Sequence, residues 1–279
     1  APGLVAALVL AGLVAGSWLL LRQARIWLPP IVPGLAASAV YAARFGLDYA
    51  EERRRRAAIT RAFSRYVSPD LVAEIAEHPE RLRLGGETVD LTVLFCDVRG
   101  FTSLSERLKA DPERLTRIIN RVLDTISGEV LAARGTIDKY MGDCVMAFWN
   151  APLRDPGHAE AGVRAACAIL AAVARLREDL RREDPDLPAL SVGVGVNTGR
   201  CIVGNIGSRW RYDYSALGDA VNVASRLESA TKDYGVPLLI GEETARRVAG
   251  TIALVEIDRL AVRGRSEAAP VFSVAAPKA

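Results

Sequence analysis

Hydrophobic residues are distributed unevenly along the chain, and the longest apolar runs come first. Residues 3–21 form an uncharged run of 19 residues, and a second uncharged run covers residues 26–43 and contains three prolines. A helix of about 20 apolar residues is long enough to span the hydrocarbon core of a bilayer. Because only a short loop separates the two runs, they predict a transmembrane helical hairpin over residues 1–46, with a pair of buried core helices as the alternative.

The following residues, 47–86, have the pattern of a helical linker. They include four consecutive arginines, residues 53–56, and a Ser68-Pro69 pair that suits a helix start, with serine as N-cap and proline in the first turn. Positive residues next to a membrane span mark its cytoplasmic side. The arginines therefore predict that the rest of the chain lies in the cytoplasm, attached to the inner membrane by the preceding hairpin.

From residue 88 onward, short apolar runs alternate with amphipathic helical patterns. The predicted elements are a strand at 88–97, helices at 102–110 and 112–133, a hairpin at 136–149, a helix at 158–182, a strand at 189–199, a hairpin-like segment at 199–208, a strand at 212–218, a helix at 219–232, a short strand at 237–241, a helix at 241–249 and two closing strands. A βαββαβ order with a long crossover helix is typical of a ferredoxin-like sheet. We therefore predict an α+β domain of this class over residues 87–275.

Charge and cysteine content narrow the possible functions. The 36 Lys and Arg residues nearly balance the 33 Asp and Glu residues, which gives a net charge of only +3 with both signs interspersed. A nucleic-acid-binding domain needs a basic surface, so we expect no nucleic-acid partner. The four cysteines form no C-x-x-C pair and lie mostly in apolar patterns, which indicates reduced core residues rather than a zinc site.

Two aspartates stand at strand ends and are candidate metal ligands. Asp97 ends the strand 88–97, and Asp143 follows Gly142 in the turn of the predicted hairpin. If these strands are neighbours in one sheet, the two carboxylates converge on one point. Carboxylate oxygens suit Mg²⁺ or Mn²⁺, and a phosphate chain can complete the coordination shell.

Two further groups of residues are candidate functional residues. Gly100, Phe101 and Thr102 follow the first aspartate at a strand-to-helix turn, where main-chain N–H groups favour phosphate. Asn222 and Arg226 are four residues apart on a predicted helix, so their side chains share one face.

Three segments together carry a resemblance to a known family: LFCDVRGFTSLSE (94–106), DKYMGDCVMAFW (138–149) and YDYSALGDAVNVASRLES (212–229). In this order they resemble the class III nucleotidyl cyclases, the adenylate and guanylate cyclases. The chain looks like a bacterial membrane-anchored adenylate cyclase, in which an N-terminal extracellular sensor domain precedes the anchor. Because these residues include no such sensor, we expect further sequence upstream.

The resemblance implies a metal site and a phosphate site. It assigns two Mg²⁺ or Mn²⁺ ions to Asp97, Val98 and Asp143. It places the β- and γ-phosphates of the nucleotide at residues 100–102, with Phe101 more a packing residue than a stacking one. It also matches Arg263 to a phosphate-contacting position at which the family more usually has lysine.

The remaining implied roles concern the ribose, the α-phosphate and the base. Asn222 would orient the ribose, and Arg226 would hold charge on the α-phosphate. Lys139 matches a lysine that recognises adenine, whereas guanylate cyclases usually have glutamate there. Ser215 departs from the Asp or Thr of adenylate cyclases, but its hydroxyl can accept a hydrogen bond from the adenine amino group. We therefore expect ATP as substrate, with GTP as the alternative.

The resemblance also implies that two chains build each site. In the family the metal aspartates come from one chain, while the lysine, asparagine and arginine come from its partner. This chain has both halves, so we expect a head-to-tail homodimer that converts ATP to cyclic AMP. An inactive cyclase-like domain used for dimerisation or signalling is the alternative of a different class.

Overall fold

A computed structural model describes most of the chain as two units. The described residues are 2–26, 29, 31–63, 85–208, 210, 212–260 and 268–275. The first unit comprises Ala1–Tyr66 and the second Val67–Ala279. The helix that is expected to begin at Ser68 lies outside the described residues, and the predicted boundaries between anchor, linker and catalytic domain stay predictions.

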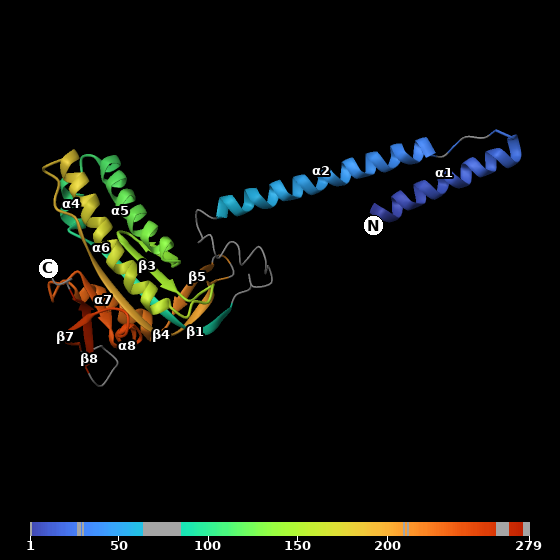
Figure 1. Cartoon of the computed structure of the whole chain (residues 1–279). Coiled ribbons are helices and arrows are strands. Elements are labelled where there is room, and N and C mark those ends of the chain that lie inside the picture. Colours follow the sequence, from blue (N-terminus) through green and yellow to red (C-terminus); the bar gives the residue numbers. More distant parts are fainter. Residues whose placement is uncertain are drawn as a thin grey trace. The chain divides into compact units, whose positions relative to one another are not determined.

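The described part of the first unit consists of two helices that lie side by side (Figure 1). Helix α1 covers Pro2–Ala24, and α2 covers Ile31–Phe63, so α2 begins only after the first two prolines of the second apolar run. The uncharged start of α2, residues 31–43, is therefore about 20 Å long at 1.5 Å per residue, which is shorter than a bilayer core of about 30 Å. No helix among the described residues is long and apolar enough to cross a membrane. The predicted transmembrane hairpin stays a prediction.

The second unit is built on one mixed sheet, whose described part has eight strands. The strands are β1 (Gly85–Arg99), β2 (Thr136–Met141), β3 (Cys144–Trp149), β4 (Ser191–Gly207), β5 (Tyr212–Leu217), β6 (Leu238–Gly241), β7 (Leu254–Leu260) and β8 (Ala269–Val274). Their order is β2-β3-β1-β4-β6-β8-β7, and β5 pairs with β4 outside this path. Strand β6 runs parallel to β4, and the other neighbouring strands are antiparallel.

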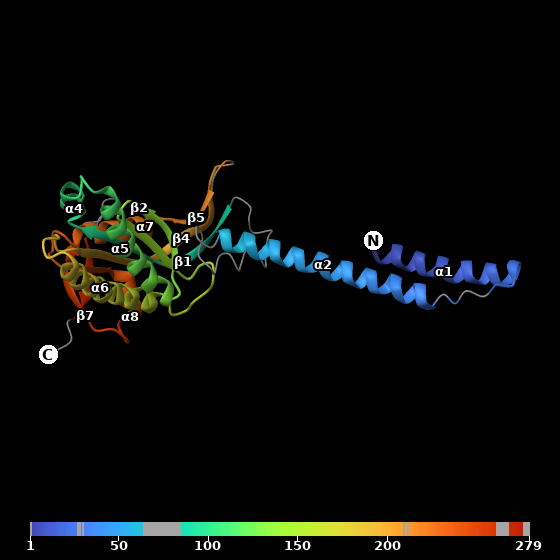
Figure 2. The same cartoon turned by 90° about the horizontal axis from the view of Figure 1, so that it is seen from above.

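Helices cover both faces of this sheet. They are α4 (Phe101–Arg107), α5 (Pro112–Ala132), α6 (His158–Glu183), α7 (Asp219–Ala230) and α8 (Glu242–Val248). Helices α5 and α6 lie side by side over one face and bury a large apolar core, while α7 packs on the opposite face (Figures 1 and 2). The chain order β1, α4 and α5, β2, β3, α6, β4 is the predicted βαββαβ order.

The largest difference from the predicted elements concerns β4. We expected a strand ending at residue 199 and a separate hairpin-like segment after it, but β4 runs unbroken from Ser191 to Gly207. It pairs with β1 along the whole length of that strand, from Arg99 opposite Ser191 to Gly85 opposite Asn205. The continuous ladder of main-chain hydrogen bonds overrides the local turn signal of the glycines. The hairpin is instead formed by β4 with β5, which projects from the body of the unit (Figure 2).

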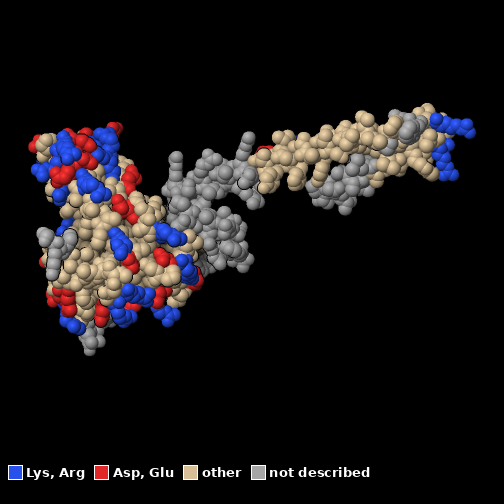
Figure 3. Space-filling model, viewed as in Figure 1, with Lys and Arg blue, Asp and Glu red and all other residues tan. Residues whose placement is uncertain are grey.

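The surface of the second unit carries charges of both signs. On the face seen in Figure 3, Lys and Arg side chains are intermingled with Asp and Glu side chains. This distribution agrees with the near balance of charge in the sequence.

Candidate active site

The two candidate metal ligands converge at one edge of the sheet. Asp97 lies near the end of β1, and Asp143 lies in the turn that joins β2 to β3. Antiparallel pairing places Cys96 of β1 opposite Val145 of β3, so Asp97 lies beside this turn. Burial, together with the negative charge of Asp97, raises the pKa of Asp143. The two carboxylates therefore lie at the same edge of the sheet, near enough for their charges to interact, and their role as metal ligands stays a prediction.

Two charged residues that the sequence analysis did not assign lie next to Asp97. The ammonium of Lys232 is 3.6 Å from Asp97 Oδ2. Glu228, on α7, is only 6% exposed, and burial and the charge of Asp97 raise the pKa of its carboxyl. Its Oε1 atom has no hydrogen-bond partner among the described residues. The spacing of four residues between Glu228 and Lys232 on a predicted helix is the one signal that could have paired them.

This arrangement fits a metal ion that takes only a few ligands from the protein and the rest from water and substrate. Among the described residues, no group of three or more His, Cys, Asp or Glu side chains is arranged to hold an ion. Mg²⁺ commonly binds to one or two carboxylates and completes its shell with water and substrate phosphates. Two carboxylates at an open sheet edge meet that need. Val98 is different, because its side chain is buried in the apolar core and only its main-chain carbonyl could bind a metal.

The predicted phosphate turn has the expected backbone. Gly100 has φ 80°, in the left-handed region that favours glycine, and it precedes the first residue of α4. Phe101 is half-buried and packs against the apolar core, as expected of a packing residue. Thr102 is exposed beside it.

The two candidate base-recognition residues come together around a third residue. Lys139 is on β2 and Ser215 is on β5, and both contact Asp138. The Ser215 hydroxyl donates to Asp138 Oδ2 at 2.8 Å, and the Lys139 ammonium is 3.3 Å from Asp138 Oδ1. Asp138 was missed by the sequence analysis, although it directly precedes Lys139.

Asn222 and Arg226 occupy α7 as predicted. Asn222 is exposed and Arg226 is half-buried, whereas Glu228 on the same helix is buried against the sheet. The spacing of four residues places Asn222 and Arg226 on one side of α7. Arg263 lies outside the described residues, so its predicted phosphate contact stays a prediction.

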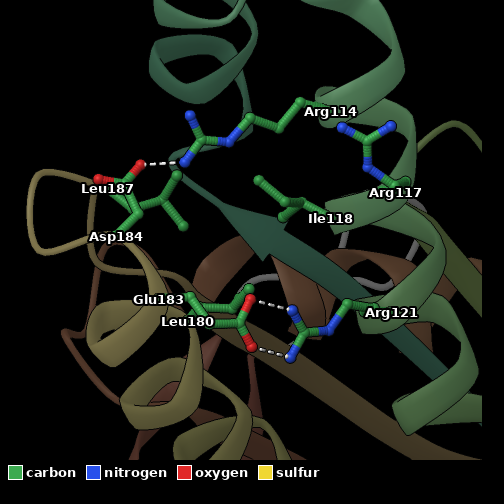
Figure 4. A pocket seen from close by; sticks show the side chains of 8 residues that line it. All are labelled: Arg114, Arg117, Ile118, Arg121, Leu180, Glu183, Asp184 and Leu187. Carbon is green, nitrogen blue, oxygen red and sulfur yellow. Dashed lines mark hydrogen bonds and ion pairs between the residues drawn. The ribbon is translucent and has the colours of Figure 1, made fainter.

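A separate pocket lies between α5 and α6 (Figure 4). Arg121 makes a bidentate ion pair with Glu183, and Arg114 pairs with Asp184 across the same hollow. None of the predicted site residues lines this pocket. These ion pairs join α5 to α6, and the pocket is separate from the candidate nucleotide site.

Comparisons with known proteins identify the family. Residues 86–273 match the model of the adenylate and guanylate cyclase catalytic domain. The chain is 34% identical over 222 residues to an adenylate cyclase of Anabaena cylindrica, and the match covers 77% of this chain and 43% of that protein. It is 33% identical over 231 residues to adenylate cyclase 1 of Rhizobium meliloti, which covers 82% of this chain and 33% of that protein. The chain thus spans less than half the length of these two curated relatives.

Solved structures agree. The structure resembles the adenylyl cyclase CyaB of P. aeruginosa with a TM-score of 0.65 and 37% identity, over 70% of this chain and 98% of that chain. It resembles the guanylyl cyclase Cya2 with a TM-score of 0.62 and 28% identity, over 68% of this chain and 94% of that chain. The chain therefore belongs to the family of adenylate and guanylate cyclase catalytic domains.

Proposed function

We propose that this protein is an adenylate cyclase that converts ATP to 3′,5′-cyclic AMP and pyrophosphate. The observation that carries the proposal is the convergence of Asp97 and Asp143 at a sheet edge, in a chain that has Lys139 four residues before the second aspartate. The similarity to the adenylate cyclases of Anabaena cylindrica and Rhizobium meliloti and to the adenylyl cyclase CyaB supports the choice of ATP.

Asp97 and Asp143 would hold Mg²⁺ or Mn²⁺, two ions per site, with the Val98 main-chain carbonyl as a further ligand. When bound, these ions lower the pKa of the ribose 3′-hydroxyl and neutralise charge on the triphosphate. The main-chain N–H groups at residues 100–102 would bind the β- and γ-phosphates, assisted by Arg263.

The reaction places further demands on α7. In-line attack of the 3′-hydroxyl on the α-phosphorus requires a fixed ribose, which Asn222 would orient through its amide. Charge develops on the α-phosphate oxygens in the transition state. Arg226 would stabilise that charge, because a guanidinium offers several N–H donors in a planar fork that matches phosphate.

We further propose that two copies of the chain form each site as a head-to-tail homodimer. One protomer would supply the metal aspartates, and its partner would supply Lys139, Asn222 and Arg226. The β4–β5 hairpin supports association, because it exposes apolar side chains that a second copy can cover: Trp210 is 83% exposed, Ile202 50% and Leu217 53%.

The test is product formation by the purified chain with ATP and GTP in parallel, in the presence of Mn²⁺ and of Mg²⁺. We expect cyclic AMP from ATP as the main product and its loss in Asp97→Ala. Cyclic GMP as the main product would support the alternative of a guanylate cyclase, which Ser215 keeps open. Absence of any cyclic product would favour the inactive, cyclase-like domain.

Attachment of the chain to the inner membrane, with the second unit in the cytoplasm, is a separate proposal. It rests on the uncharged run at residues 3–21 and the arginines at 53–56. Membrane fractionation of cells that produce the chain tests it: recovery in the membrane pellet after a high-salt wash supports attachment, and release into the soluble fraction contradicts it.

A further inference from the structure

A buried carboxylate lies in the middle of the base-recognition group, and the mechanism above gives it no role. The Asp138 side chain is 0% exposed, whereas that of Lys139, the next residue, is 40% exposed. Burying a carboxylate costs free energy unless hydrogen bonds or opposite charges compensate for it. Ser215, Ala216 and Lys139 offset part of this cost, and burial still raises the pKa of the Asp138 carboxyl above its usual value.

The contacts of Asp138 fix the direction of the hydrogen bond to Ser215. Asp138 Oδ2 accepts from the main-chain N–H of Ala216 at 3.3 Å and from the Ser215 hydroxyl at 2.8 Å. A main-chain N–H can only donate, so Oδ2 must be an acceptor. A serine hydroxyl has one hydrogen. Since that hydrogen is committed to Asp138, the remaining lone pairs of Ser215 can only accept hydrogen bonds.

Lys139 is held in a different way. Its ammonium lies within ion-pair distance of Asp138 Oδ1, yet Oδ1 has no hydrogen-bond partner among the described residues. The carboxylate attracts the ammonium through this contact and engages at most one of its N–H groups. An ammonium has three donors and no acceptor, so Lys139 keeps donors for a ligand.

We propose that Asp138 is a specificity-determining positioning residue, which makes Ser215 an obligate acceptor and thereby selects adenine over guanine. The inference rests on the proposed function and names a residue that controls its substrate. Adenine offers a donor, its 6-amino group, and an acceptor, its N1 atom. These complement the acceptor Ser215 and the donor Lys139. Guanine offers a 6-oxo acceptor and an N1–H donor. It would therefore present an acceptor to the acceptor Ser215 and a donor to the donor Lys139, and neither pair can form a hydrogen bond.

Removing the carboxylate releases the Ser215 hydroxyl. In Asp138→Ala, that hydroxyl is free to donate to the 6-oxo group of guanine. We expect the ratio of kcat/KM for ATP to kcat/KM for GTP to fall by about tenfold or more, since hydrogen-bond mismatches give discrimination of this order or greater. The ratio is measured on one protein sample, so a loss of folded protein lowers both values and cancels.

Two further variants separate this role from a structural one. Asp138→Asn retains an oxygen that accepts from Ser215 and Ala216, so we expect it to keep the ATP preference even if its rates fall. Adding Asp138→Ala to Ser215→Ala should leave the ratio of Ser215→Ala unchanged, because Asp138 then has no hydroxyl to orient. Asp124→Ala, which removes an exposed carboxylate of α5, is the matched control and should keep the wild-type ratio.

An unchanged ratio in Asp138→Ala would overturn the inference, as would an additional change in the double variant. If Asp138→Ala forms too little product, competition of ATP and GTP for binding gives the ratio of their dissociation constants in that variant and in the wild type, and an unchanged ratio of dissociation constants overturns the inference there too. The wild type reports on the proposed function separately. A wild type that prefers GTP or forms no product would contradict both the proposed function and this inference. An ATP-selective wild type with an equally selective Asp138→Ala would contradict this inference alone.

Discussion

A chain of hydrogen bonds joins polar side chains beneath α6 and α8. Thr92 is 0% exposed, and its hydroxyl bonds to His158 Nδ1 and to the Thr198 hydroxyl, each at 2.8 Å. Thr198 continues the chain to Thr244 at 2.8 Å, and Arg247 lies 3.1 Å from His158 Nε2. Because an unpaired polar group in such a place costs free energy, this chain ties β1 and β4 to the two helices.

His158 makes that chain sensitive to pH. Burial and the positive charge of Arg247 lower the pKa of His158 below its usual 6.5. As pH falls below about 6.5, His158 binds a proton in the unfolded chain but not yet in the folded chain. The free energy of unfolding therefore decreases until the pH reaches the lower pKa of the folded state. We expect the urea midpoint to drop between about pH 7.5 and about pH 5.5, and to drop less in His158→Gln. An equal drop in both proteins would assign the effect to other groups.

Among the elements, α7 depends most visibly on glycine. It carries Asn222, Arg226 and Glu228, and it lies directly on β4. A Cβ atom at Gly195 would be 2.3 Å from both the Ala224 carbonyl oxygen and the Glu228 main-chain nitrogen. Only glycine lets the helix approach the strand so closely, and this approach places Glu228 near Asp97.

Gly195→Ala should therefore destabilise the second unit by about 2 kcal/mol, because overpacking against main-chain atoms forces the helix to move. We expect cyclase activity to fall as well, since α7 carries two proposed catalytic residues. Gly128→Ala is the matched control. That glycine is an exposed residue of α5 with no atom within 4 Å of an added Cβ, and the change should stabilise by up to about 1 kcal/mol. Chemical unfolding measures both, and equal midpoints for the two variants would contradict the packing argument.

At the scale of the whole molecule, local sequence signals predicted most of the helices and strands and the placement of Asp97 and Asp143 at one edge of the sheet. The helix predicted over residues 112–133 is α5, and at its start the Asp111 side chain accepts from Arg114 N at 2.9 Å. Asp97 and Asp143 could be paired from the sequence because each stands beside its strand end, and neighbouring strand ends meet at one edge.

Long-range packing explains what could not be predicted. The role of Asp138 depends on β5 folding back along an extended β4, which brings Ser215 against a residue 77 positions away. No local pattern contains that contact. The start of α2 at Ile31, inside the uncharged run at residues 26–43, could likewise not be read from the apolar pattern alone.

Complementation between two inactive variants tests the central claim, that two copies of this chain build one ATP-cyclising site. Asp97→Ala lacks a metal ligand and Asn222→Ala lacks the ribose contact, so each homodimer should form no cyclic AMP. With random exchange, half of the dimers are mixed and each keeps one intact site, so activity should return to about a quarter of the wild-type value. Differently tagged chains, purified through both tags, confirm that mixed dimers are present. Mixed dimers that form no cyclic AMP, beside an active wild type, would contradict the shared site.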